Sequence, residues 1–229
     1  RPGTYTIEEL ATAGWFFDSV SGTGVVDPTS AIQEVTVLAG DSRTLTYQNT
    51  QGAQITIAKN GIGPDGTSTD FGFTATGDTV DTVFSVAGGE SVTLSSDEQP
   101  GYLRPGTYTI EELATEGWFF DNVSGGQGNP DSPIQQVTVV AGDNKTLTYQ
   151  NTQGVQITVV KDAIGPNASE TDFDFTVDGT TIDNEFTLTG SDSITLSSNE
   201  QDEYVRPGSY TVEELATRGW ILTEVNGDG

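Results

Sequence analysis

The sequence has 229 residues, of which 34 are acidic and 8 basic, and it contains no His, Cys or Met. Without His and Cys there is no imidazole or thiolate metal site, no disulfide, and no catalysis of the Ser-His or Cys-His kind. A formal net charge of -26 argues against nucleic acid and anionic membrane surfaces as partners, because both are bound through Lys and Arg. No run of about 18 apolar residues is present, so no membrane span is expected in this stretch.

In chain order, the first recognisable segment is a motif that occurs three times. Residues 1–17 read RPGTYTIEELATAGWFF, residues 104–120 read RPGTYTIEELATEGWFF, and residues 206–222 read RPGSYTVEELATRGWIL. The copies are offset by 103 positions (1 to 104) and then by 102 positions (104 to 206). A repeat of about one hundred residues has the size of a domain and not of a solenoid turn.

Two short polar stretches, both reading NTQG, mark the predicted joints between repeats at residues 49–52 and 151–154. These joints predict the C-terminal half of one repeat at 1–50, a complete repeat at 53–152, and the N-terminal part of the next repeat at 155–229. We name these the first partial repeat, the middle repeat and the third partial repeat. Two explanations fit such a chain: it is a cut from a longer array, or neighbouring subunits exchange strands, as in donor-strand complementation.

Short segments with alternating apolar residues run through the whole sequence. Ile55 and Ile57 form one such pattern, and Phe71 and Phe73 form another. Gly, Asp, Asn and Pro interrupt these segments at intervals of about ten residues. The pattern is typical of strands joined by turns, and it predicts an all-β fold of tandem Ig-like β-sandwiches with about seven strands each. The helix-like run at 111–116 is short, so we interpret it as the end of a strand followed by a turn.

The same alternation places three polar side chains, Lys59, Glu112 and Asn151, on faces that otherwise carry apolar residues. Three buried polar groups are costly unless they meet one another. The apolar residues that share the three faces are Ile55 and Ile57, Tyr108 and Ile110, and Leu147 and Tyr149.

These three side chains are suited to a covalent reaction. Burial lowers the pKa of a Lys and raises that of a Glu. A neutral amine held beside a carboxamide, with a protonated carboxyl group to move the proton, forms an amide and expels ammonia. Proximity lowers the barrier to such an intramolecular isopeptide bond, as it does in enzymes. The alternative is a buried Lys-Glu ion pair, hydrogen-bonded to Asn, without covalent chemistry.

The equivalent positions in the two partial repeats hold the same residue types. Glu9 and Asn49 occupy them in the first partial repeat, and Lys161 and Glu214 occupy them in the third. The partners missing from each set are expected outside this chain or on a neighbouring one.

The order of these motifs resembles the collagen-adhesin B-type and SpaA-like domains, which are repeated extracellular modules of Gram-positive pili and surface adhesins. The matching residues are Lys59, Tyr108 to Glu112, Gly117-Trp118 and Tyr149-Gln150-Asn151. The resemblance implies a prealbumin-like sandwich in each repeat and a Lys-Asn cross-link catalysed by Glu. It thereby assigns Lys59, Asn151, Lys161 and Asn49 to cross-links, and Glu112, Glu9 and Glu214 to their catalysis.

Other motifs carry weaker signals. Asn122, Asn144 and Asn167 each begin an N-x-Ser/Thr triplet and are candidate glycosylation sites of an exported protein. The acidic loops at 96–99 and 198–203 have the oxygen ligands that calcium prefers, but they lack EF-hand spacing, so solvated loops are the simpler interpretation.

The sequence therefore predicts an extracellular or cell-surface structural protein, a section of a filament, pilus or stalk whose partners are identical repeats or subunits. The alternative is an adhesin or carbohydrate-binding module, for which an exposed Trp among Trp15, Trp118 and Trp220 would be the signal. We expect these tryptophans to open the same strand in each repeat and to pack. A hydrolase is disfavoured, because the adjacent acids Glu111 and Glu112 point to opposite faces of a strand. The acidity fits solubility, high salt or cation recruitment equally well.

Overall fold

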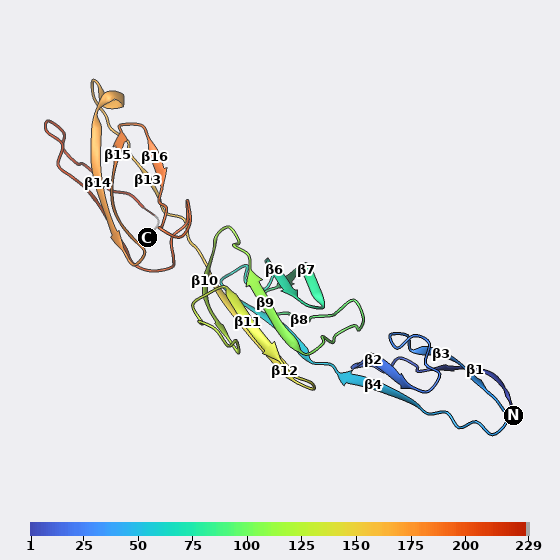
Figure 1. The fold of residues 1–229 in the computed structure, drawn as a ribbon. Coiled ribbons are helices and arrows are strands. Elements are labelled where there is room, and N and C mark those ends of the chain that lie inside the picture. Colours follow the sequence, from blue (N-terminus) through green and yellow to red (C-terminus); the bar gives the residue numbers. More distant parts are fainter. Residues whose placement is uncertain (228–229) are drawn as a thin grey trace. The chain divides into compact units, whose positions relative to one another are not determined.

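The computed structural model describes residues 1–227, which form 17 strands and one short 3₁₀ turn, η1 (Ala168–Glu170). The all-β prediction is confirmed (Figure 1). The chain divides into two compact units. The first comprises residues 1–61, 67–114 and 121–150, and the second comprises residues 62–66, 115–120 and those from 151 onward.

The strands of the middle repeat form two four-stranded sheets, as a β-sandwich requires. One sheet has the order β10-β12-β5-β8 and the other the order β11-β9-β6-β7. Each sheet brings together strands from both ends of the repeat. The strands are β5 (Gln54–Ile62), β6 (Asp70–Gly77), β7 (Val80–Ala87), β8 (Ser91–Thr93), β9 (Gly106–Glu112), β10 (Trp118–Ser124), β11 (Ile134–Val139) and β12 (Asn144–Gln153).

The two partial repeats contain different subsets of these strands, and both include an equivalent of β9. The first has β1 paired with β3 and β2 paired with β4, whereas the third has β13 paired with β16 and a sheet β15-β14-β17. Their bounds are β1 (Gly3–Glu8), β2 (Trp15–Gly22), β3 (Ile32–Val37), β4 (Leu45–Gln51), β13 (Thr158–Val160), β14 (Asp172–Gly179), β15 (Ile182–Thr189), β16 (Ser193–Thr195) and β17 (Tyr210–Glu214).

Strand register recurs with the sequence motif. Tyr5 of β1 faces Val35, as Tyr108 of β9 faces Val137. Phe73 of β6 faces Glu112, and the third partial repeat pairs Phe175 with Glu214 in the same way. The copied sequences therefore make the same strand pairings.

The core of the middle repeat lies between its two sheets. Period-2 alternation turns Ile55, Ile57, Phe73, Tyr108 and Tyr149 inward, and each of these residues is at most 1% exposed. The ring of Phe73 meets the edge of Tyr149 at a centroid distance of 5.1 Å. Burial of each large apolar side chain stabilises the fold by about 1.5–3 kcal/mol.

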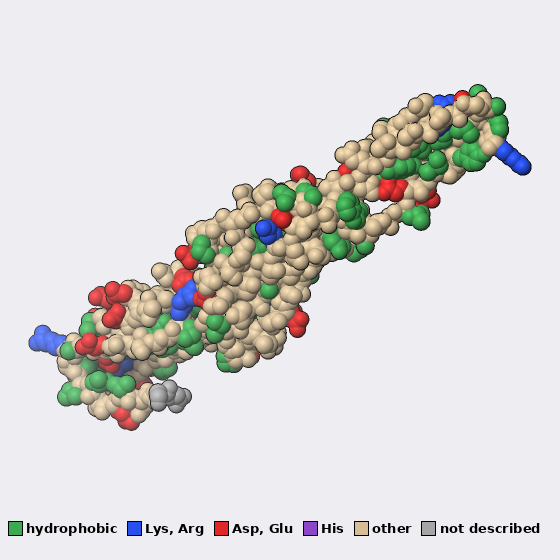
Figure 2. Space-filling model, turned by 90° about the horizontal axis from the view of Figure 1, so that it is seen from below, with side chains coloured by type: hydrophobic (Ala, Val, Ile, Leu, Met, Phe, Trp, Pro, Cys, Tyr) green, Lys and Arg blue, Asp and Glu red, His purple; other side chains and the backbone are tan. Residues whose placement is uncertain are grey.

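The first partial repeat exposes residues that the middle repeat buries. Tyr5 and Ile7 are 46% and 42% exposed, whereas their counterparts Tyr108 and Ile110 are 1% and 0% exposed. Residues 1–50 contain the equivalents of β9 to β12 only, so nothing takes the place of β5 to β8. The result is an apolar groove of about 560 Å³, and Figure 2 shows hydrophobic side chains gathered at this end of the chain. Its lining includes Tyr5, Ile7, Val35, Val37, Leu45 and Tyr47.

Two local expectations have different outcomes. The 111–116 run is indeed the end of β9 followed by a turn at Glu116 and Gly117. Trp15 and Trp118 open β2 and β10, but Trp220 opens no strand, because residues 215–227 carry no regular structure. Within the described residues, no helix is long and apolar enough to cross a membrane.

Candidate functional site

Lys59 and Glu112 meet inside the middle repeat. The Lys59 Nζ atom lies 3.1 Å from Oε1 and 3.2 Å from Oε2 of Glu112, so the ammonium donates to the carboxylate. Their side chains are 0% and 2% exposed. Nζ also lies 4.2 Å from the centroid of the Phe71 ring. The prediction that the amine and the acid point into one interior is confirmed by this geometry.

Burial changes the acid-base behaviour of the lysine. Desolvation lowers the pKa of Lys59 to about 8, although attraction and hydrogen bonding to Glu112 and attraction to Asp121 oppose the shift. A lysine with this pKa is partly neutral near physiological pH, whereas an ordinary lysine is almost wholly charged. The environment thus supplies the nucleophilic form of the amine.

Glu112 is held in place from several sides. Its backbone N–H donates to the carbonyl of Pro133 at 3.1 Å, and its strand pairs with β6 at Phe73. Tyr149 lies nearby on β12, and burial, together with the charge of Glu112, raises the pKa of its phenol. The Tyr149 hydroxyl donates to the carbonyl of Ile110 at 3.4 Å. The strand that carries Glu112 therefore has a paired strand on each side, β6 and β11.

Asn151 lies on β12, which is the neighbour of β5 in the same sheet. The residue is 3% exposed, and Lys59 on β5 is 2% exposed. The expected inward orientation of the asparagine is therefore observed.

The first partial repeat shows the Glu and Asn without the Lys. The Asn49 amide donates to the Glu9 carboxylate. Glu9 Oε2 and Asn49 Oδ1 are buried, and neither has a hydrogen-bond partner. A buried oxygen left without a partner costs about 1–3 kcal/mol. In the middle repeat the carboxylate at the equivalent position contacts Lys59, whereas residues 1–50 contain no lysine.

The third partial repeat shows the Lys and Glu without the Asn. Lys161 Nζ lies 2.9 Å and 3.0 Å from the two carboxylate oxygens of Glu214. Nζ is also 4.4 Å from the centroid of Phe173, the counterpart of Phe71. These side chains are 11% and 16% exposed, so this pair is less buried than the pair in the middle repeat.

The remaining candidate residues lie on the surface or in ion pairs. Asn144 and Asn167 are exposed and Asn122 is half-buried, so glycosylation at these positions stays a prediction. In the acidic loops, Glu98 binds Arg104 and Glu200 binds Arg206. Among the residues that the structure describes, no three acidic side chains are grouped to hold a metal ion.

Sequence reasoning did not single out a second polar network, which contains Gln99 and Arg104. The available signal was that Arg begins all three copies of a motif in a chain with only eight basic residues.

Comparisons with known proteins found matches among solved structures. No family model and no curated protein matches the sequence. Among solved structures, the Bacillus anthracis TIE protein is 12% identical, with a TM-score of 0.38, over 96% of this chain and 47% of that chain. The pilus-presented adhesin Spy0125 (Cpa) is 17% identical, with a TM-score of 0.34, over 57% of this chain and 38% of that chain.

A third solved structure is the major pilin protein T-13 of Streptococcus pyogenes. It is 15% identical, with a TM-score of 0.29, over 92% of this chain and 86% of that chain. The chain spans less than half the length of the first two structures.

Proposed function

We propose that this chain is a section of an extracellular filament, pilus or adhesin stalk built of tandem β-sandwich repeats, with joints at residues 49–52 and 151–154. Its partners are then identical repeats or subunits, and its work is mechanical and not enzymatic. The observation that carries the proposal is the buried Lys59-Glu112 pair, which joins the first strand of the middle repeat to its fifth strand, β9. The domain-sized sequence period and the recurrence of the pair at Lys161 and Glu214 support it.

We further propose that Lys59 and Asn151 become joined by an isopeptide bond. The neutral Lys59 Nζ attacks Cγ of Asn151, so that a C–N bond forms. Glu112 takes the proton that Nζ loses and gives it to the Asn151 amide nitrogen, which leaves as ammonia. The carboxyl group ends as it began, and one amide replaces another.

The three repeats together support this arrangement. Glu9 holds an Asn, Glu112 holds a Lys, and Glu214 holds a Lys, each at the same place in the repeat. We infer from these equivalent positions that Lys and Asn contact the same carboxylate in a complete repeat. By this correspondence the third partial repeat lacks an equivalent of Asn151 to join to Lys161. The first partial repeat lacks an equivalent of Lys59 to join to Asn49.

Force spectroscopy on the whole chain tests the mechanical proposal. With the bond formed, the 91 residues between positions 59 and 151 stay closed when the termini are pulled. The Lys59→Ala variant releases them and lengthens by about 300 Å more at ~3.3 Å per residue. Equal final lengths of parent and variant would remove the covalent proposal, and a parent that unfolds at negligible force would remove the mechanical one.

Strand exchange between subunits is a second form of the same function. The apolar groove of the first partial repeat and the unpartnered oxygens of Glu9 and Asn49 favour it, because both match what β5 to β8 cover in the middle repeat. Sedimentation of the chain over a range of concentrations tests this form. Concentration-dependent chains of subunits support it, and a monomer at every concentration contradicts it.

The alternative function is a cell-surface adhesin or carbohydrate-binding module. Trp15 is 43% exposed and offers an aromatic face in one copy, but its counterpart Trp118 is 5% exposed. A ligand site shared by all repeats is therefore not favoured. Binding of the chain to a glycan array that is lost in Trp15→Ala would support this alternative.

A further inference from the structure

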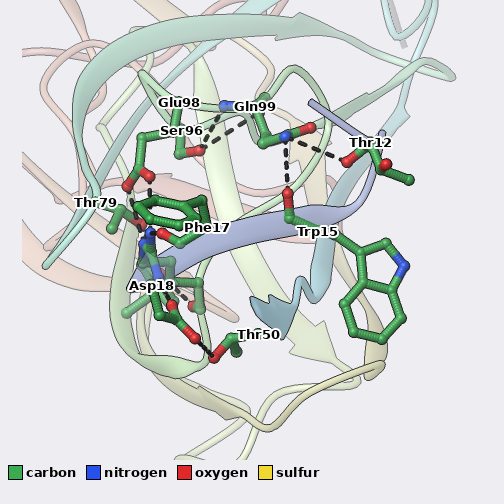
Figure 3. A network of polar contacts seen from close by, with 11 residues as sticks. Thr12, Trp15, Phe17, Asp18, Thr50, Thr79, Ser96, Glu98 and Gln99 are labelled. Carbon is green, nitrogen blue, oxygen red and sulfur yellow. Dashed lines mark hydrogen bonds and ion pairs between the residues drawn. The ribbon is translucent and has the colours of Figure 1, made fainter. Parts of the chain in front are cut away.

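A second cluster of side chains links the first partial repeat to the middle repeat. Gln99 Nε2 donates to the backbone carbonyls of Trp15 at 3.0 Å and Thr12 at 3.4 Å. Gln99 Oε1 accepts from the backbone N–H of Gly14 at 3.3 Å. Figure 3 shows this amide facing the two backbone oxygens while the indole of Trp15 points away from it. The Gln99 side chain thus forms hydrogen bonds with three backbone groups of the preceding repeat.

Arg104 makes the charged part of the same contact. Its Nη1 donates to Asp18 Oδ1 at 2.6 Å, and its Nη2 donates to the carbonyl of Phe17 at 2.9 Å. Its Nε and Nη2 donate to Glu98 at 3.0 Å and 2.9 Å. The guanidinium carbon lies 4.8 Å from the centroid of the Phe16 ring. A planar guanidinium can satisfy two carboxylates, a carbonyl and an aromatic face at once, which an ammonium cannot.

The carboxylates are tuned for this role. Desolvation tends to raise the pKa of Asp18, but hydrogen bonds from Thr50 and Arg104 and attraction to Arg104 lower it below its usual value. The hydrogen bond from Arg104 likewise lowers the pKa of Glu98. Both groups therefore remain charged near neutral pH.

A glycine makes room for the contact. Gly14 has a φ of +78°, and a Cβ there would lie 3.1 Å from ring atoms of Tyr102. The carbonyl of Gly14 accepts from Gly52 N–H at 2.8 Å. Any other residue at this position would be strained and would press on the ring.

The same cluster recurs 102 residues later, within the second compact unit. Gln201 binds the carbonyls of Trp118 and Thr115 and the N–H of Gly117. Arg206 donates to the carbonyl of Phe120 at 2.8 Å and lies 4.9 Å from the Phe119 ring. Glu200 and Tyr204 take the places of Glu98 and Tyr102. A set of contacts reproduced at two joints is a built feature and not a chance surface contact.

We propose that this cluster is a docking interface, the joint clasp, by which each repeat grips the end of the repeat before it. One side of the clasp is Gln99, Tyr102 and Arg104, and the other side is residues 12–18. Its partner is a sandwich end that presents a left-handed Gly, the following aromatic ring and a carboxylate, as in the Gly-Trp-Phe-Phe-Asp sequences at 14–18 and 117–121. The clasp restricts bending at the joint. This inference rests on the proposed function only in taking the repeats to be serial modules.

The third copy of the motif lacks two of the groups that the clasp contacts in the first copy. Residues 219–223 read Gly-Trp-Ile-Leu-Thr, so the Gly and Trp remain while the aromatic ring and the carboxylate are missing. An arginine at the position of Arg104 loses both its cation–π contact and one ion pair when the preceding repeat ends in a sequence such as 219–223. The clasp therefore distinguishes the first two ends from the third.

The test uses the full chain, in which introduced cysteines are unique because the natural sequence has none. Spin labels at Thr29→Cys and Asp81→Cys, both exposed positions, report the distance between the first partial repeat and the middle repeat by electron resonance. The parent should give one narrow distance distribution. Gln99→Ala with Arg104→Ala should broaden it at least about twofold, since domains without a firm interface move freely.

The second joint supplies the matched control. Gln201→Ala with Arg206→Ala should leave the labelled distance unchanged, and Arg104→Lys should broaden it to an intermediate degree. Unchanged circular dichroism and melting of the middle repeat show that the variants still fold. A narrow distribution in the Gln99/Arg104 double variant would overturn the clasp. The intact mass of the same samples reports the cross-link separately, so loss of one proposal is distinguishable from loss of the other.

Discussion

The middle repeat and the first partial repeat contain the same five-residue sequence, Tyr-Thr-Ile-Glu-Glu, yet its environment differs between them. In the middle repeat Tyr108, Ile110 and Glu112 are buried, whereas Tyr5 and Ile7 of the first partial repeat are close to half exposed. Local sequence and register are equal, because β1 pairs with β3 in the same register as β9 pairs with β11. The difference comes from β5 to β8, which the middle repeat possesses and residues 1–50 lack. Burial of Glu112 and its neighbours therefore depends on β5 to β8 and not on the local sequence alone.

The glutamates show the same difference at atomic detail. Both oxygens of Glu112 are close to the ammonium of Lys59, whereas Oε2 of Glu9 has no partner. The carboxylate is present in both, but only one has the cation that makes its burial tolerable. The following experiments either remove this contrast or sharpen it.

The largest effect is expected from completing the first partial repeat. A chain with a second copy of residues 53–103 placed before Arg1 regains the equivalents of β5 to β8 and a lysine at the Lys59 position. Tyr5, Ile7 and Glu9 should then become buried, and amide exchange in β1 should slow by orders of magnitude, because its opening becomes that of a whole domain. Exchange of β1 that stays as fast as in the parent would show that strand content is not the cause of the contrast.

Removal of the buried cation is expected to have the next largest effect. In an Asn151→Ala variant, which has no cross-link, the added change Lys59→Met leaves Glu112 buried without its partner, which should lower the free energy of unfolding of the middle repeat by about 3–5 kcal/mol, measured by chemical denaturation. The matched variant Lys161→Met should cost less, since that pair is 11% and 16% exposed. Equal losses at the two sites would contradict the role assigned to burial.

The apolar positions sharpen the comparison further. Ile110→Ala should lower the free energy of unfolding by about 2–5 kcal/mol because it leaves a cavity in a packed core. The equivalent change Ile7→Ala, at a residue that is 42% exposed, should cost about 1 kcal/mol or less. Thermal unfolding of both variants measures the difference, and similar costs would mean that the two strands are packed alike.

The pH dependence provides a smaller effect with a definite sign. In an Asn151→Ala variant, which cannot form the cross-link, Lys59 has a pKa of about 8 when folded against 10.5 when unfolded. Between these values the unfolded chain binds a proton that the folded chain does not, so stability rises with pH. From about pH 8 to about pH 9.5 the gain should be roughly 2 kcal/mol. The same variant with Lys59→Met should show no such rise; a rise there would assign it to other groups.

The extent to which the sequence predicts this molecule differs between the core and the joint. Alternation alone identified the inward orientation of Lys59, Glu112 and Asn151, since a strand has a fixed period of two. The joint clasp escaped prediction because Gln99 and Arg104 lie in irregular segments, where no periodicity tells which backbone groups a side chain reaches. Trp220 was expected to open a strand. Trp15 and Trp118 open strands that pair with β4 and β12, but the described part of the chain after Trp220 contains no equivalent of these partners. The local motif does not form a strand alone.

The intact mass of the whole chain, measured in denaturant, tests the central claim most directly. The account predicts a mass lower by one ammonia than the sequence requires, and full sequence mass in Lys59→Ala and in Glu112→Gln. A parent chain that shows its full sequence mass, with Lys59 and Asn151 recovered in separate unlinked peptides, would contradict it.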